Sequence, residues 1–173
     1  MHKTLITLLT AALLTALVSC GGKKQEEIVA PEGMHTLNLS RFGKPFAIFV
    51  PDTVANKMEI TEQSNGSLTL KVGKNFAISI NEQAGDIAMR KEDIKGDEVN
   101  KFKSYITDEP NAIMWESEIT KPEYHFYTIQ KIGTSNYVFE DVVPMDGEPF
   151  SKENTQKMYD SAKTIVEKEK PDA

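Results

Sequence analysis

The stretch KMEITEQSNGSLTLKVGKNFAISI (residues 57–80) decides the fold class of this chain. Apolar and polar residues alternate on both sides of Asn65-Gly66, a dipeptide that favours the tight turn of a β-hairpin. Gly73-Lys74-Asn75 makes a second tight connection, to the apolar run Phe76–Ile80. Residues 57–80 therefore predict three antiparallel strands joined by short turns.

Further strands are expected on both sides of this meander. Each is a short run rich in β-branched, aromatic and other apolar residues, and turn residues separate the runs. Pro51-Asp52 ends one of them, and Gly133-Thr134-Ser135-Asn136 joins the last two as a hairpin. The expected strands are residues 36–39, 46–50, 112–117, 124–132 and 136–143.

Between these groups of strands the apolar period changes. From Ile87 to Ile106, apolar and long side chains recur mostly every three or four residues, which is the spacing of a helix face. Gly96 interrupts the pattern and predicts two helices, with Asp97-Glu98 favouring the start of the second through the helix dipole. Pro110 ends the segment.

The C-terminal segment predicts the clearest helix. Ser151 is a suitable N-cap, and one apolar face follows it. The chain as a whole therefore predicts an α+β domain: an antiparallel sheet of about six or seven strands, with a middle helical segment and a C-terminal helix packed on it. The residues of the C-terminal helix face are Thr155, Met158, Tyr159, Ala162, Ile165 and Val166.

The N-terminus predicts a secretory signal. A basic start at Lys3 precedes the apolar stretch Leu5–Val18. As a helix this stretch would reach about 21 Å, which is short of the roughly 30 Å hydrocarbon core of a membrane. Leu17-Val18-Ser19-Cys20 resembles the lipobox of bacterial lipoproteins, in which the cysteine receives a diacylglycerol and the signal is cut before it.

The lipobox resemblance implies three parts: a signal peptide (residues 1–19), a lipidated cysteine with a flexible tether (residues 20–33), and a single α+β domain (residues 34–173). Cys20 is the only cysteine, so no disulfide framework competes for it. The implied partner is a membrane, reached through a palmitate-labelled anchor on Cys20. The implied location is the cell envelope at the outer membrane, on either its periplasmic or its surface face.

Charge argues against nucleic acid as a partner. The chain carries 20 basic and 26 acidic side chains, a net charge of −6, and loss of residues 1–19 would remove Lys3 and no acid. Acidic and basic residues are interspersed, so the sequence offers no basic stripe for phosphates.

A second resemblance concerns the folded part. Phe46, Ile48 and Pro51 match an F-x-I-x-x-P strand with a proline turn, Ala162 and Ile165 match the apolar face of a last helix, and Tyr124–Tyr127 match an aromatic strand. These features resemble the fold shared by the photosystem II oxygen-evolving subunit P (PsbP) and the nuclear import factor Mog1. Members of that family mostly act as accessory or binding subunits, so the resemblance implies a partner protein and transfers no functional residue.

The sequence carries no familiar catalytic or metal motif. G-x-S-x-G, S-x-x-K and H-E-x-x-H are absent, and no histidine pair has the spacing of zinc ligands. His35 is expected to be solvated, and His125 to lie on the opposite face of its strand from Tyr124 and Phe126, as a structural histidine. No metal site, cofactor or catalytic residue is predicted.

Aromatic residues on the later strands are the candidate contact residues, with Trp115, Tyr127 and Tyr137 expected to meet a partner or ligand. The first hypothesis is a non-catalytic lipoprotein that binds a protein partner as an accessory subunit. The alternative is a lipoprotein that binds a small ligand or a glycan through the aromatic strands. A third hypothesis, a hydrolase that relies on carboxylates alone, would need two acids across a cleft.

Overall fold

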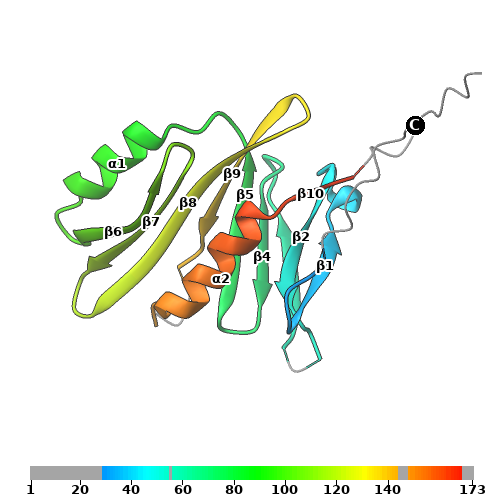
Figure 1. Ribbon diagram of the computed structural model, residues 1–173, viewed down its shortest axis with the longest axis horizontal. Helices are drawn as coiled ribbons and strands as arrows, with labels where there is room; N and C mark the ends of the chain where they lie inside the picture. Colours follow the sequence, from blue (N-terminus) through cyan, green and yellow to red (C-terminus); the bar gives the residue numbers. More distant parts are fainter. Residues whose placement is uncertain (1–28, 55, 144–147, 169–173) are drawn as a thin grey trace, which may run out of the picture.

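The computed structural model describes residues 29–54, 56–143 and 148–168, which form two antiparallel sheets and two α-helices (Figure 1). The predicted signal peptide and Cys20 lie outside the described residues. In chain order the elements are β1 (Met34–Asn38), the 3-10 helix η1 (Ser40–Phe42), β2 (Phe46–Pro51), β3 (Met58–Glu62), β4 (Leu68–Val72), β5 (Phe76–Glu82), α1 (Ile87–Gly96), β6 (Lys101–Glu109), β7 (Ala112–Glu118), β8 (Pro122–Ile132), β9 (Ser135–Asp141), α2 (Lys152–Lys163) and β10 (Val166–Glu167).

The larger sheet has seven strands in the order β3-β4-β5-β9-β8-β7-β6, and all neighbours are antiparallel. The hairpin between β3 and β4 turns at Gly66, whose φ of 79° is natural for glycine. The amide of Gln63 donates to the carbonyl of Ser67 at 2.8 Å and closes this turn. The predicted α+β class and seven-stranded antiparallel sheet are confirmed.

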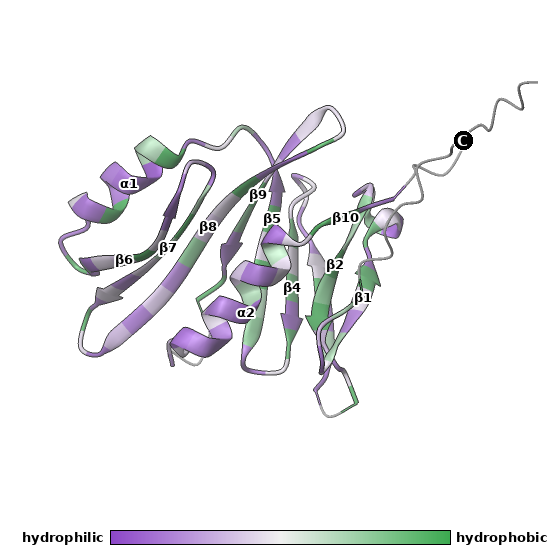
Figure 2. Cartoon of the chain, in the orientation of Figure 1, coloured by the Kyte–Doolittle hydropathy of each residue, from purple (hydrophilic) through white to green (hydrophobic). Residues whose placement is uncertain are grey.

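A smaller sheet, in the order β1-β2-β10, lies beside the larger one. Its central strand β2 is buried from Phe46 to Val50 and stands out as hydrophobic in Figure 2. The ring of Phe46 lies 5.0 Å from that of Tyr137 on β9 and meets it edge to face. Contacts of this kind join the two sheets into one hydrophobic core.

The two helices cover opposite faces of the large sheet. Neighbouring residues on a strand point to opposite faces, as Phe126 and Tyr127 do on β8. Phe126 belongs to the core cluster that contains Met158 of α2, whereas Tyr127 belongs to a second cluster with Ile94 of α1. Both faces of the sheet are therefore partly covered.

Helix α2 begins as predicted and ends earlier. The side chain of Ser151 accepts a hydrogen bond from the amide of Asn154 at 3.2 Å, and Thr155 and Met158 are buried beneath the first turns. The predicted helix face extended to Val166, but the helix ends at Lys163 and Val166–Glu167 pairs with β2 instead. Backbone pairing with an open strand edge replaces the last predicted turn.

The predicted second middle helix is wrong, because residues 101–109 form β6. The ladder between β6 and β7 shifts register twice, once after Phe102 and once after Tyr105. A β-bulge adds one residue and so places side chains three positions apart on one face. The ring centres of Phe102 and Tyr105 accordingly lie 4.7 Å apart, which reproduces a helical spacing within a strand.

Asp97, expected to start that second helix, instead follows the end of α1. Its carboxylate accepts hydrogen bonds from the amides of Val99 and Asn100, both at 2.8 Å, and turns the chain into β6. These two bonds hold the pKa of Asp97 below its usual range. A short polar side chain that bonds the backbone two residues on is characteristic of a turn.

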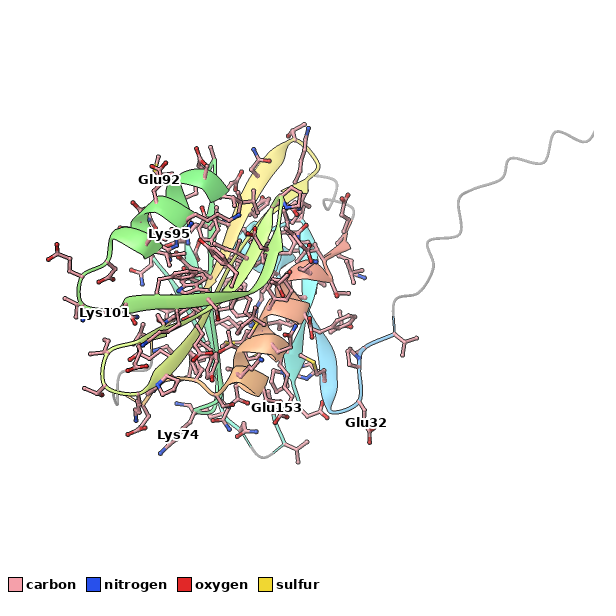
Figure 3. All side chains as sticks on the ribbon, turned by 60° about the vertical axis from the view of Figure 1, so that its left-hand side comes forward. Glu32, Lys74, Glu92, Lys95, Lys101 and Glu153 are labelled. Atoms are coloured by element: carbon pink, nitrogen blue, oxygen red, sulfur yellow. The ribbon has the colours of Figure 1, made fainter. Side chains whose placement is uncertain are left out.

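Charges of both signs are spread over the surface, as the labelled side chains in Figure 3 show for Glu92 on α1, Lys74 after β4 and Glu153 at the start of α2. Among the described residues, neither helix combines the length and hydrophobicity of a membrane-crossing segment.

Candidate functional site

A cavity of about 500 Å³ lies where the loop before β2, the end of β5 and the β8–β9 hairpin meet. We call it the Lys44 pocket. Its volume falls in the range of about 300–1,000 Å³ that is usual for small-ligand sites. Its lining residues are Ser40, Gly43, Lys44, Pro45, Glu82, Ile132, Gly133, Thr134, Ser135 and Tyr137.

Lys44 enters the pocket because its neighbours are anchored on both sides. Leu39 and Phe46 are fully buried, and Gly43 reverses the chain between them with a φ of 71°. Lys44 itself is only 6 % exposed. Its Nζ lies 3.6 Å from Oε2 of Glu82 and 5.7 Å from the centre of the Tyr137 ring. A lysine so deeply placed usually has a charged partner, and here the partner is Glu82.

Strand pairing places the other polar groups of this pocket. Glu82 and Tyr137 are register partners across β5 and β9, and the hydroxyl of Ser135 donates to Oε1 of Glu82 at 2.7 Å. The Ser135 hydrogen bond, with help from Lys44 and Tyr137, holds the pKa of Glu82 below its usual range. Burial, followed by the charge of Glu82, raises the pKa of Tyr137. At neutral pH the pocket therefore holds a carboxylate and a protonated phenol.

A smaller cavity of about 240 Å³ lies under α1, where its lining includes Arg90, Trp115, His125 and Asp141. Trp115 and His125 are register partners across β7 and β8, and their rings lie 5.3 Å apart. The guanidinium of Arg90 lies 5.7 Å from the Trp115 ring and 3.0 Å from Oε2 of Glu140. We call this cavity the His125 cleft.

His125 is held between two carboxylates. Its Nδ1 lies 2.8 Å from Oδ2 of Asp141, and its Nε2 lies 3.5 Å from Oε2 of Glu123 and 3.4 Å from the side-chain nitrogen Nδ2 of Asn100. Burial acts to lower the pKa of His125, but the hydrogen bond and charge of Asp141, with Glu123, outweigh it and raise the pKa. Asp141 also accepts the amide of Phe126 at 2.9 Å, which fixes its carboxylate.

The raised pKa of His125 predicts that the protein loses stability as the pH rises. The folded state holds the proton more tightly than the unfolded chain does, so this stabilisation is complete below the unfolded pKa of 6.5. It is lost as the pH rises through the higher folded pKa. We expect the unfolding free energy of H125Q to decrease less than that of the wild type as the pH rises above 6.5. The measurement is urea titration at several pH values, on a soluble form that begins at Gly21. H35Q is the control, and an equal slope in H125Q and the wild type would contradict the prediction.

The three predicted contact residues are buried and do not form one surface. Trp115, Tyr127 and Tyr137 are 5 %, 8 % and 2 % exposed. Trp115 and Tyr127 share the α1 face, whereas Tyr137 belongs to the core on the opposite face. Within the described residues they therefore offer no exposed aromatic platform. Trp115 lines the His125 cleft and Tyr137 lines the Lys44 pocket.

The two histidines lie close to where they were expected. His125 lies on the α1 side with Trp115, opposite Phe126. His35 lies 3.5 Å from Asp52 with about a third of its side chain exposed. No group of three or more potential ligand side chains in the described residues is arranged to hold a metal ion.

Sequence reasoning missed Lys44 and Asp141 as site residues. Lys44 stands between a glycine and Pro45-Phe46, directly before the strongly apolar strand β2. Asp141 is the last residue of strand β9, where its carboxylate can accept a hydrogen bond from a backbone amide of the neighbouring strand.

Comparisons with known protein families, curated proteins and solved structures found no match to this chain. The resemblances to bacterial lipoproteins and to the PsbP/Mog1 fold therefore stay predictions. The fold defines an α+β protein with one seven-stranded antiparallel sheet and a helix on each face.

Proposed function

We propose that this chain is a lipid-anchored protein of the bacterial cell envelope that binds a small polar ligand in the Lys44 pocket, without catalysis. One observation carries the proposal: an almost buried lysine and a carboxylate 3.6 Å from it both line a pocket of about 500 Å³. A concave site with a few convergent polar groups is the usual form of a ligand site.

Stability alone gives little reason for this arrangement. The Lys44 side chain is 7 % exposed and that of Glu82 is 45 % exposed, so the lysine loses most of its hydration for a partner that remains half in water. The distance of 3.6 Å between Nζ of Lys44 and Oε2 of Glu82 is longer than that of a well-formed charged hydrogen bond, about 2.7–2.9 Å. The ammonium therefore keeps hydrogen-bond donors for a third group, and a ligand that enters the pocket can use them.

The lipobox at Leu17–Cys20 supports the anchored location. A single acyl chain gives weak, reversible membrane binding, whereas two or three chains on one residue give stable anchoring. The following segment, residues 20–33, would then hold the folded domain close to the membrane. We therefore place the protein in the envelope, at the outer membrane.

An accessory subunit, the first hypothesis from the sequence, would need an exposed surface for its partner. The ligand proposal rests instead on the Lys44 pocket. The large apolar side chains that are exposed among the described residues belong to several loops and elements. These side chains are Val29, Val54, Met89, Val99, Ile119 and Val143.

The carboxylate-only hydrolase has less support from the Lys44 pocket. Glycosidases use two carboxyl groups on either side of the bond that breaks. Of the residues that line the Lys44 pocket, Glu82 is the one carboxylic acid, and it faces a lysine. We therefore assign binding, not hydrolysis, to this pocket.

The test is a ligand screen by thermal unfolding, with the lipidated protein in detergent and a library of small polar metabolites. A ligand at 100 times its Kd stabilises a protein by about 2.7 kcal/mol, which raises the Tm of a domain of this size by several degrees. We expect such a shift for at least one compound, and its loss in K44M. K57M is the control, because Lys57 is 83 % exposed and pairs with Glu59 at 2.7 Å.

Two outcomes would contradict the proposal: no stabilising compound, or equal shifts in K44M and the wild type. Cross-linking of the native protein in cells adds a second measurement. A single stoichiometric protein neighbour, retained in K44M, would identify an accessory subunit instead.

A further inference from the structure

We infer that the ligand of the Lys44 pocket is a neutral polyhydroxyl compound, a saccharide or a cyclitol, held by neighbouring hydroxyl groups against Lys44 and Glu82. This inference rests on the proposed binding function and adds the chemical class of the ligand. Three features of the pocket lead to it: the balance of charge, the set of donors and acceptors, and the environment of Tyr137.

The charges that face the pocket cancel. Lys44 contributes one positive charge and Glu82 one negative charge, and their charged atoms lie 3.6 Å apart. An anion that approached the ammonium would be repelled by the carboxylate, and a cation that approached the carboxylate would be repelled by the ammonium. Removing a charged ligand from water would add a large cost without a net opposite charge to offset it. A neutral ligand fits this balance.

The donors and acceptors select hydroxyl groups. An ammonium only donates hydrogen bonds, and a carboxylate only accepts them. A hydroxyl does both, so one can accept from Nζ of Lys44 while its neighbour on the same ring donates to Glu82. The two hydroxyls would lie side by side in the pocket against the ion pair, because the 3.6 Å between Nζ and Oε2 is too short to hold an oxygen between them. The hydroxyl of Ser135 already bonds Oε1 of Glu82 at 2.7 Å, which orients the carboxylate before any ligand arrives.

The Tyr137 ring is already packed on the protein side. Phe46 meets it edge to face at 5.0 Å, and the Lys44 ammonium lies 5.7 Å from its centre. With 2 % of the residue exposed, the ring has no open face for an aromatic ligand to stack on. The apolar lining comes instead from Pro45 and Ile132, which suit the C–H groups of a sugar or cyclitol ring. The pocket therefore suits a saturated ring with several hydroxyls.

The test uses saturation-transfer NMR on the lipidated, full-length protein in detergent, which detects weak ligands. The probes are methyl α-D-glucopyranoside, methyl α-D-galactopyranoside, methyl α-D-mannopyranoside and myo-inositol, with sodium acetate, glycine and methylammonium as charged probes of small size. We expect transfer to at least one polyhydroxyl probe, and a Kd weakened tenfold or more in K44M and in E82Q, because each loses a hydrogen bond to a charged group.

K57M and E59Q are the matched controls, since they remove the members of an exposed Lys–Glu pair with a separation of 2.7 Å. The Tm of each variant without ligand shows whether it is folded. A polyhydroxyl probe that binds the wild type but not the folded K44M and E82Q variants supports the inference.

The remaining outcomes overturn it in different ways. If acetate, glycine or methylammonium binds in a Lys44-dependent manner and no polyhydroxyl probe does, the ligand class is wrong and the binding function stands. If polyhydroxyl probes bind equally to wild type, K44M and E82Q, the pocket is not their site. If no probe binds and the metabolite screen is also empty, the inference and the proposed function fail together.

Discussion

Replacement of Cys20 by serine will abolish labelling of the protein with radioactive palmitate and move it from the detergent-rich to the aqueous phase on phase separation. In bacterial lipoproteins the diacylglycerol is attached to the sulfur of the cysteine, and serine has no sulfur to carry it. Each buried methylene of an acyl chain contributes about 0.8 kcal/mol, so loss of two or three chains removes nearly all affinity for the membrane. The expected change is therefore almost complete.

Ser19→Ala is the matched control, since it changes the residue directly before Cys20 and keeps a small side chain there. We expect it to be labelled and anchored as the wild type is. Palmitate labelling decides the matter, because an uncleaved apolar stretch in C20S could itself hold some protein at a membrane. Equal labelling of C20S and the wild type would refute the lipoprotein assignment.

Local sequence patterns were sufficient for most of the fold. The meander of residues 57–80 depends on alternation and on Asn65-Gly66, and both act within one hairpin. The Ser151 cap and the buried face of α2 are likewise local. Such features form the same structure whatever surrounds them, so a single sequence can predict them.

The errors arose where tertiary pairing overrides local spacing. The apolar residues of β6 have a helical period because two bulges interrupt its pairing with β7, and a bulge leaves no simple alternating pattern. Val166–Glu167 leaves the helix pattern because β2 offers an open edge. For β6 and for Val166–Glu167, the structure is determined by pairing with another strand, β7 or β2, which local sequence spacing does not reveal.

The candidate site was less predictable for the same reason. Tyr137 was selected as an aromatic contact residue, and it does line the Lys44 pocket, but through its buried position beside Glu82. Lys44 and Glu82 are far apart in the sequence, and only the packing of the small sheet against β5 and β9 brings their charges together. Sequence alone gives no register between these strands, so it could not show that the two residues form a pair.

The second large effect is expected from Asp141→Ala. Asp141 connects two groups: Oδ2 faces Nδ1 of His125 at 2.8 Å, and Oδ1 accepts a hydrogen bond from the amide of the buried Phe126 at 2.9 Å, whereas Glu123 lies farther from His125, at 3.5 Å from Nε2. Its side chain is only 5 % exposed. Removing one member of a buried ion pair costs about 3–5 kcal/mol, and D141A also leaves the buried Phe126 amide without its acceptor. We expect a loss of that size in the free energy of unfolding, measured by urea titration.

Asp52→Ala is the matched control, because Asp52 also lies beside a histidine, His35 at 3.5 Å, yet its side chain is 55 % exposed. An exposed pair contributes between about 0 and 1 kcal/mol, so D52A should change stability little. A loss in D141A no larger than that in D52A would show that the contacts of Asp141 with His125 and Phe126 contribute little to stability.

Two further variants separate the contributions of Asp141. Asp141→Asn keeps an oxygen that can accept from Phe126 but removes the charge, so it should lose less stability than D141A and still flatten the pH dependence that His125 causes. In H125Q/D141A the unpaired imidazole is gone as well, and residues in direct contact do not add their effects independently. The double variant should therefore be more stable than the sum of the two single losses predicts. If the two losses add strictly, the stability lost in D141A comes from the hydrogen bond to the Phe126 amide and not from the contact with His125.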